Sequence, residues 1–212
     1  HVGDVMGLRV LSICGGLETG LLALKELGIP VDEYHTYEIF EPAIELSKRH
    51  FPEIIHHGDV IGADFSQFKG FDLVMAGTCC QSLSVVRQEN NQVCSGLKGK
   101  SGIFFEYARA VKEIQPKWFL LENVVPKSKT DQNIITDNLG GQIPQLINSN
   151  LFSAQDRERL YWTNIHIGSL PKLNTTVLKD IMVSDAPEKD YYDKPYIFHG
   201  EDKKVIATLQ VN

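Results

Sequence analysis

The residues best suited to covalent chemistry are two adjacent cysteines, Cys79 and Cys80, which are followed by the polar side chains of Gln81 and Ser82. They come directly after an apolar run, residues 71–76, that is bounded by glycines and is typical of a buried strand. A thiol on a loop just past a buried strand is where an α/β fold presents a nucleophile to a ligand. The alternative is that both cysteines are small buried hydrophobic residues.

The rest of the chain alternates strand-like and helix-like segments. This alternation predicts an α/β fold with a doubly wound, mostly parallel sheet and helices on both faces. The expected strands are 8–13, 34–39, 54–57, 71–76 and 118–121, and the expected helices are 19–27, 41–50, 101–114 and 133–139. Residues 84–102 are predicted to form a loop, residues 144–151 and 160–167 to be strand-like or mixed, and the chain beyond residue 170 to be irregular. The predicted apolar face of the helix 101–114 consists of Phe104, Phe105, Ala108 and Val111, and Tyr161 and Trp162 are predicted to lie in the core.

Residues that can bind a ligand follow most of the predicted strands. They are Gly15 with Gly16, Glu38, Asp59, Cys80, and Glu122 with Asn123. Because the carboxyl ends of parallel strands meet at one edge of a sheet, these residues predict a shared binding site.

The first three of these strand ends indicate an adenosine-bearing ligand. Glu38 is placed to accept hydrogen bonds from ribose hydroxyls, and Asp59 to accept one from an adenine amino group. The glycine pair lacks the G-x-G-x-x-G spacing of a pyrophosphate site, which argues against a phosphate cradle. Taken singly, each position is as well explained by a turn glycine or a solvated acid.

Length, charge and cysteine content limit the class of protein. The 212 residues suit one domain with its own core, and residues 1–5, which precede Met6, are interpreted as a cloning remnant. A net charge of −6 argues against a broadly basic nucleic-acid footprint. The four cysteines lack the spacing of zinc ligands or of a disulfide framework, so we expect no metal and a reducing, intracellular location, cytoplasmic or nucleoid-associated. No apolar run is long enough to span a membrane.

Three motifs, taken in order along the chain, resemble those of the DNA (cytosine-5) methyltransferase family. They are the cysteine loop Gly77–Ser84, the triplet Glu122-Asn123-Val124, which is similar to the family's E-N-V, and Gln155-Asp156-Arg157-Glu158-Arg159, which is similar to its Q-x-R-x-R. Weaker matches are Leu11–Gly20, Glu38, Gly58-Asp59-Val60 and Lys100–Arg109. The resemblance runs from Leu11 to Trp162 and implies the Rossmann-like fold of the S-adenosylmethionine-dependent methyltransferases.

The resemblance implies a role for each catalytic residue. Cys80 would add as a thiolate to C6 of a cytosine flipped out of double-stranded DNA, so that C5 can take a methyl group. Glu122 would hold N3 and the exocyclic amine of the base, and Arg159 would bond O2. Arg157 would help to keep the surroundings of the thiolate positive, and Asn123 would brace the loop backbone.

The resemblance also implies S-adenosylmethionine as the methyl donor, with S-adenosylhomocysteine as the product and no metal. The residues that it assigns to the cofactor lie in the first glycine turn, at the next three strand ends and at the start of the helix after the cysteine loop. They are Cys14, Gly15, Gly16, Leu17, Glu18, Thr19, Glu38, Ile39, Asp59, Val60, Gly77 and Ile103.

The sequence departs from the family pattern at both loops. Cys79 stands where the family has proline, which removes a fixed φ just before the nucleophile. In the first turn, Cys14 replaces the usual aromatic residue and Gly15 replaces an acid or alanine. The first change is expected to loosen the cysteine loop or to leave its geometry to Thr78 and Gln81, and the second to weaken the apolar contact with the cofactor.

The last departure concerns the C-terminal part. Residues 6–170 are expected to form the catalytic, cofactor-binding domain, and residues 171–212 the incomplete start of a target-recognition region. Leu178–Met182 resembles the segment that leads into this region in the family. Because the family continues further, we expect a fragment, a natural subunit that needs a second chain, or a degenerate relative. A non-catalytic, partner-dependent subunit and an RNA cytosine methyltransferase remain alternatives to a DNA methyltransferase, and a restriction–modification role stays open.

Overall fold

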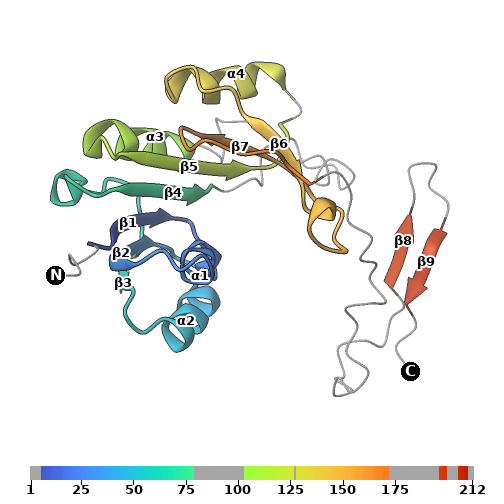
Figure 1. Cartoon of the computed structure of the whole chain (residues 1–212), viewed down its shortest axis with the longest axis horizontal. Coiled ribbons are helices and arrows are strands. Elements are labelled where there is room, and N and C mark those ends of the chain that lie inside the picture. The colour runs from blue at the N-terminus through green and yellow to red at the C-terminus, as the bar shows by residue number, and fades with distance from the viewer. Residues whose placement is uncertain (1–5, 79–102, 127, 172–195, 200–204, 210–212) are drawn as a thin grey trace. The chain divides into compact units, whose positions relative to one another are not determined.

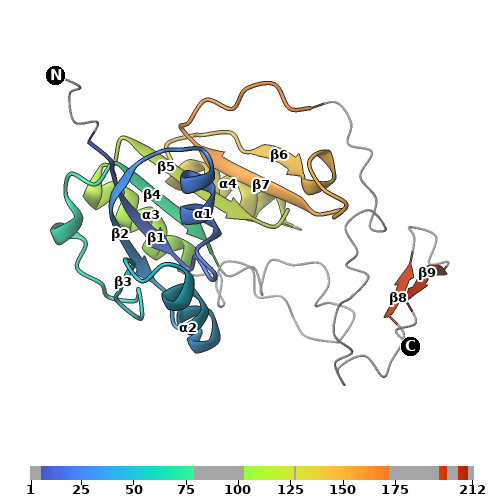
Figure 2. The ribbon, with the colours of Figure 1, turned by 60° about the horizontal axis from the view of Figure 1, so that its bottom comes forward.

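The computed structural model describes residues 6–78, 103–126, 128–171, 196–199 and 205–209. Most of these residues belong to one sheet of seven strands in the order β3-β2-β1-β4-β5-β7-β6, which can be followed in Figure 1 and Figure 2. The strands are β1 (Leu8–Ile13), β2 (Val31–Tyr37), β3 (Ile55–His56), β4 (Leu73–Gly77), β5 (Trp118–Asn123), β6 (Gln145–Asn148) and β7 (Glu158–Thr163). Strands β1 to β5 are parallel, and β7 is antiparallel to both β5 and β6. The predicted α/β class, with a doubly wound and mostly parallel sheet, is confirmed.

Four α-helices connect the strands, and their ends carry recognisable signals. They are α1 (Thr19–Glu26), α2 (Glu41–His50), α3 (Ile103–Ile114) and α4 (Lys129–Asn138), with short 3-10 turns at Ser66–Phe68 and Ser149–Leu151. Pro42 lies in the first turn of α2, where no backbone N–H is needed. The hydroxyl of Ser128 accepts from the backbone N–H of Asp131 and so caps α4.

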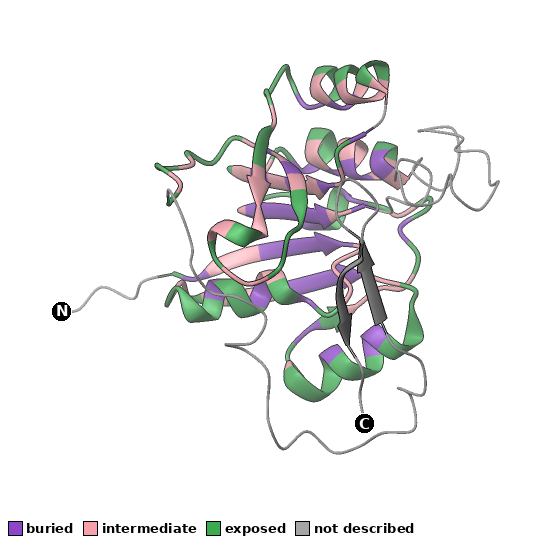
Figure 3. Cartoon of the chain, turned by 90° about the vertical axis from the view of Figure 1, so that its right-hand side faces the viewer, coloured by how far each residue is buried: buried purple, intermediate pink, exposed green. Residues whose placement is uncertain are grey.

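The two faces of the sheet bury separate cores, because neighbouring residues of a strand point to opposite sides. One core contains Leu11, Val74 and Leu121 and is closed by residues of α3 and α4. The other contains Val10, Leu73 and Met75 and is closed by Leu21 and Leu24 of α1. Figure 3 shows that burial is concentrated in the central strands, while the outer sides of the helices are exposed.

Several predicted element bounds were wrong. Strand β2 ends at Tyr37, so that Glu38 lies after it, and β5 continues through Glu122 and Asn123 because both pair with β7. Helix α4 begins at Lys129, four residues earlier than the prediction, because Ser128 supplies a cap. Irregular structure beyond residue 170 was predicted, but Tyr196–His199 (β8) and Val205–Leu209 (β9) form an antiparallel pair.

The apolar face of α3 also differs from the expected one. Phe104, Tyr107 and Ala110 are buried, whereas Phe105, expected in the core, is exposed. The helix is amphipathic with the predicted period, but its buried stripe runs one position earlier at each turn, and Tyr107 belongs to it. Trp162 is buried as expected, while Tyr161 is only partly buried.

The chain divides into two compact units, His1–Thr175 and Thr176–Asn212. The sheet and all the predicted site residues belong to the first, and the β8–β9 pair belongs to the second. That residues 171–212 form part of a target-recognition region stays a prediction. In the part of the chain that the structure describes, no helix is both long and apolar enough to cross a membrane.

Strand β5, which pairs with β4 on one side and β7 on the other, should contribute strongly to the stability of the first unit. Leu121 is fully buried against α3 and α4, so Leu121→Ala should lower the free energy of unfolding by about 2–5 kcal/mol through lost burial and a residual cavity. Urea denaturation measures this change. Leu22→Ala on the exposed side of α1 is the control, with an expected change of about 0.5 kcal/mol or less. Equal losses in the two variants would contradict the burial assignment.

Candidate active site

The first glycine turn follows β1 and is tied to the end of β2. The backbone N–H of Cys14 donates to the carbonyl of Tyr37 at 2.8 Å, and the N–H of Gly16 donates to the Glu38 carboxylate at 3.0 Å. The other oxygen of Glu38 accepts from the N–H groups of Ile39 and Phe40. Glu38 therefore fixes the conformation of the turn as well as its own position.

Two residues of this turn adopt a strained backbone conformation. Cys14 and Glu18 both have φ of 55°, in the left-handed region that side chains with a Cβ rarely occupy. Gly16, with φ of 61°, is the residue type that suits such a conformation, and a Cβ added there would meet nothing within 4 Å. The outer side of the turn is therefore open to a ligand.

Glu18 points inward from the same turn and is buried. Its carboxylate accepts from the Tyr34 hydroxyl at 2.8 Å and from the Thr36 hydroxyl at 2.5 Å, and it also interacts with the Ser12 hydroxyl. Burial raises the pKa of Glu18, although these three hydrogen bonds oppose the rise. Burial and the neighbouring Glu18 also raise the pKa of Tyr34.

A cavity of about 560 Å³ lies beside the turn and reaches across the sheet edge to β5 and β7. It is lined by Ser12, Cys14, Gly15, Gly16, Glu18, Thr19, Gly20, Ala23, Met75, Ala76, Gly77, Leu120, Glu122, Arg157 and Tyr161. The glycine turn contributes Gly15, Gly16 and the acid Glu18 to the lining, and the opposite side contributes Glu122 and Arg157.

The charged side of the site is organised by an ion pair between neighbouring strands. Arg159 Nε lies 2.8 Å from Glu122 Oε1, and the Arg159 side chain also donates to the carbonyl of Glu158 at 2.7 Å. Burial and the Glu122 carboxylate raise the pKa of Tyr161, which lies opposite Glu122 on β7. Arg157 precedes β7 and is exposed.

Asn123 links the end of β5 to the root of the cysteine loop. Its side-chain amide donates to the Thr78 hydroxyl at 2.8 Å, and its amide oxygen accepts from the N–H of Val124. Both Asn123 and Thr78 are buried. Thr78, the residue just before Cys79, is thus held by a buried side-chain contact.

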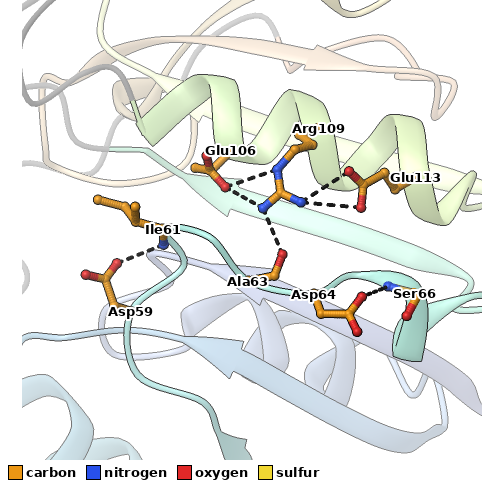
Figure 4. Close-up of polar contacts among 8 residues, drawn as sticks. All are labelled: Asp59, Ile61, Ala63, Asp64, Ser66, Glu106, Arg109 and Glu113. Carbon is orange, nitrogen blue, oxygen red and sulfur yellow. Dashed lines mark hydrogen bonds and ion pairs between the residues drawn. The ribbon is translucent and has the colours of Figure 1, made fainter.

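The segment after β3, residues 57–66, is contacted by Arg109 of α3, as Figure 4 shows. The guanidinium donates to the carbonyl of Ala63 at 2.9 Å, is paired with Glu106 at 2.6 Å and with Glu113 at 3.1 Å, and lies 4.4 Å from the centre of the Phe65 ring. Within this segment, the Asp59 carboxylate accepts from the N–H of Ile61, and the Asp64 carboxylate accepts from that of Ser66. Arg109 therefore joins the helix that follows the cysteine loop to the segment that contains Asp59.

The structure brings together part of the predicted site. Eight of the predicted residues line the cavity: Cys14, Gly15, Gly16, Glu18, Thr19, Gly77, Glu122 and Arg157. Glu38, Arg159 and Asn123 lie outside its lining but contact the turn, Glu122 and Thr78 respectively. Leu17, Ile39 and Asp59 are exposed, Val60 is buried, and Ile103 packs against the core at the start of α3. Cys80 lies outside the described residues.

Sequence reasoning did not assign several lining residues to the site, among them Tyr161, and it did not identify Arg109. Tyr161 was assigned to the core, yet it lines the cavity. Its signal was available, because Arg157, Arg159 and Tyr161 alternate and such residues share one face of a strand. Arg109 gave no such signal, since its contact with Ala63 spans 46 positions of the chain. Among the described residues there is no cluster of side chains that could hold a metal ion.

Comparison with known proteins gives one family and several relatives. A model of the C-5 cytosine-specific DNA methylase family matches residues 8–209. The chain is 32% identical to the orphan methyltransferase M.SPRI of Bacillus phage SPR, over 96% of this chain and 45% of the relative. It is 32% identical to the orphan methyltransferase M.Rho11sI of Bacillus phage rho11s (73% of this chain, 32% of the relative) and 26% identical to the Type II methyltransferase M.NgoBV of Neisseria gonorrhoeae (78% and 43%). The chain spans less than half the length of each of these relatives.

Loss of the Arg109 fork should loosen the segment that contains Asp59. Arg109→Lys keeps the charge but cannot bond Ala63, Glu106 and Glu113 together, so the amides of Ile61 and Ser66 should exchange with deuterium faster than in the unaltered protein. Hydrogen-exchange mass spectrometry measures this change. Glu113→Gln, which removes only the exposed partner, should leave exchange in residues 59–66 nearly unchanged. If both variants behave alike, Arg109 does not hold this segment.

His57, which follows β3 and contacts His35, should make the stability of the protein depend on pH. His57 Nε2 lies 2.7 Å from His35 Nδ1, and their rings stack with centroids 4.9 Å apart. Burial, and then the rings of His35 and His56, lowers the pKa of His57 below its ordinary 6.5. The unfolded chain therefore takes up this proton first as the pH falls, so the stabilisation by neutral His57 is lost on acidification.

The expected outcome is a smaller loss of stability in His57→Gln than in the unaltered protein between about pH 7.5 and about pH 5.5, because the variant lacks this titration. Chemical denaturation at several pH values within that window measures both slopes. An identical slope in the two proteins would show that His57 does not contribute.

Proposed function

The chain belongs to the C-5 cytosine-specific DNA methylase family, and on that premise we propose that it forms the catalytic part of a DNA (cytosine-5) methyltransferase. The observation that supports this most strongly is the Glu122–Arg159 ion pair beside the cavity of the glycine turn. In this proposal Glu122 bonds the pyrimidine base, and the Arg159 guanidinium is a cation held beside it by the ion pair. Because the chain spans less than half of its relatives, the activity of the whole protein is part of the proposal.

The residues of the glycine turn suit S-adenosylmethionine, which supplies an electrophilic methyl group when bound. Gly16 has open space where a Cβ would lie, so the backbone there can come close to a ligand. A Cβ on Gly77 would instead approach the carbonyl of Cys14 at 3.4 Å, so glycine at this position lets the first turn lie close to the end of β4. Glu38, bonded to Gly16, retains acceptor capacity for a ribose hydroxyl. The fold and the donor set therefore fit an adenosine-bearing cofactor without a metal.

The nucleophile in this proposal is Cys80, which follows the buried Thr78–Asn123 contact by two positions. Its thiolate forms a bond to C6 of cytosine, which makes C5 able to take the methyl group from the cofactor. A base then removes the proton from C5, and the thiolate leaves C6. The atoms balance as one methyl group gained and one proton lost at C5.

Side chains of β5 and β7 stabilise the charge that develops on the base. One oxygen of the Glu122 carboxyl group accepts from the exocyclic amine of cytosine, and the other delivers a proton to N3. The Arg159 guanidinium, which pairs with Glu122, donates to O2. Arg157 adds positive charge at the cavity, which favours the thiolate form of a nearby cysteine. Asn123 positions the loop through Thr78.

The proposed substrate is double-stranded DNA with the target cytosine flipped out of the helix, because a base within the stack cannot enter such a site. The first unit is not broadly basic, and the chain as a whole has a net charge of −6. Recognition of the target sequence is therefore assigned to a region beyond the first unit or to a second chain.

The two adjacent cysteines allow a matched test. Transfer of labelled methyl groups from S-adenosylmethionine to cytosine-containing duplex DNA should be lost in Cys80→Ala, by a factor of about 10³ or more, and kept in Cys79→Ala. The same assay on transfer RNA separates a DNA substrate from an RNA substrate.

Trapping distinguishes catalysis from simple binding. DNA containing 5-fluorocytosine lacks the proton that the last step removes, so the unaltered protein should form a stable covalent complex with it and Cys80→Ala should not. Equal methyl transfer by Cys80→Ala would overturn the assignment of the nucleophile. The absence of any adduct, with the full-length protein and cofactor present, would favour a non-catalytic subunit.

A further inference from the structure

Glu18 is a buried acid that the proposed chemistry leaves without a task. It exposes 1% of its surface, lines the cavity beside the glycine turn, and has a strained φ of 55°. A strained, buried and ionisable residue costs folding free energy, and such residues gather where a ligand is bound. Its hydrogen bonds to hydroxyl groups lower the cost of burying the carboxyl group. They do not explain why position 18 carries an acid.

The surroundings of Glu18 provide donors but no counter-ion. Tyr34, Thr36 and Ser12 direct hydroxyl groups at the carboxylate. Among the described residues, no lysine, arginine or histidine forms an ion pair with Glu18. Burial raises the pKa of Glu18, and the three hydroxyl donors, which favour the charged form, oppose this rise. In its charged form the carboxylate attracts a cation in the adjoining cavity.

The neighbouring turn is shaped to fit this carboxylate. A Cβ on Gly15 would lie 2.4 Å from Glu18 Oε2 and 2.3 Å from the Ser12 hydroxyl oxygen, closer than atoms approach without displacement. Only glycine at position 15 leaves the carboxylate in its place. The glycine at position 15 and the acid at position 18 are therefore matched in shape.

The other charges at the cavity are already balanced or positive. Glu122 is paired with Arg159, and Arg157 is a cation. Glu18 is thus the acid of the cavity whose charge is not offset by an ion pair in the described residues. Because Glu18 exposes only 1% of its surface, its charge is less screened by water than a surface charge and acts over several ångströms.

From this arrangement we infer that Glu18 is a specificity-determining residue that favours the cationic methyl donor over the neutral product. The inference rests on the proposed function. S-adenosylmethionine carries a sulfonium charge, and S-adenosylhomocysteine, which has lost the methyl group, carries a neutral thioether in its place. The remainder of the two molecules is identical, so a nearby carboxylate distinguishes them by charge. The consequence for the enzyme is weaker inhibition by its own product.

Calorimetric titration of the full chain with each of the two molecules tests this inference. In the unaltered protein the donor should bind more tightly than the product. In Glu18→Gln, which keeps the shape and removes the charge, the ratio of the two dissociation constants should shift toward the product by about tenfold. Glu18→Asp, which keeps the charge, should retain the preference for the donor even if both molecules bind more weakly.

Glu38→Gln is the matched control, because Glu38 is the acid that the proposal assigns to the ribose, a group that both molecules contain. It should weaken the binding of both molecules by the same factor. A Glu18→Gln protein that is folded by circular dichroism, with an unchanged ratio of dissociation constants, would overturn the inference.

A second measurement needs no variant. The analogue of the donor in which a protonated amine replaces the sulfonium should bind the unaltered chain more tightly than the product does, and equal affinity would contradict the inference. If neither the donor nor the product binds the unaltered chain, the proposed function itself fails.

Discussion

Glu122 and Arg159 lie on strands that run in opposite directions, and their ion pair joins the two halves of the site. Strand β5 pairs in parallel with β4, so that Gly77 lies beside Glu122, and in antiparallel with β7, so that Tyr161 lies beside the same residue. A parallel neighbour would present its carboxyl end at this edge, whereas the reversed β7 presents the start of the strand, where Arg159 lies. The reversal is what allows a Q-x-R-x-R segment to reach the carboxyl ends of the other strands.

The glycine turn meets this edge from the other side, and its geometry depends on two carboxylates with different tasks. Glu38 faces outward and fixes the turn through the N–H of Gly16. Glu18 faces inward and fills the space that a side chain at position 15 would need. Two left-handed residues other than glycine in one turn raise the free energy of the folded state, and these contacts offset that cost. The turn is therefore rigid before a ligand arrives, which lowers the entropy lost on binding.

The sequence allowed the fold class and the approximate positions of β1 to β5 to be predicted, because buried parallel strands are continuous apolar runs and glycines mark their limits. It did not allow the end of β5 to be predicted, since Glu122 and Asn123 interrupt the apolar pattern and remain in the strand only through pairing with β7. The buried stripe of α3 was misplaced because Tyr107 and Phe105 carry similar apolar area, and only packing decides which one faces the core. The anchoring by Arg109 depends on a contact between distant parts of the chain, which no local pattern contains.

Cys79, which occupies the position of the family's proline, directly follows the buried Thr78. In the family, proline restricts φ just before the nucleophile, which keeps the loop root from sampling other conformations. Here the preceding residue, Thr78, is buried, and its hydroxyl is bonded to Asn123 within a strand that is paired on both sides. A buried hydrogen bond restrains the side chain and backbone of Thr78 through packing, and this restraint does not require proline at the next position. The loop therefore begins from a fixed point even though one of the usual means of fixing it is absent.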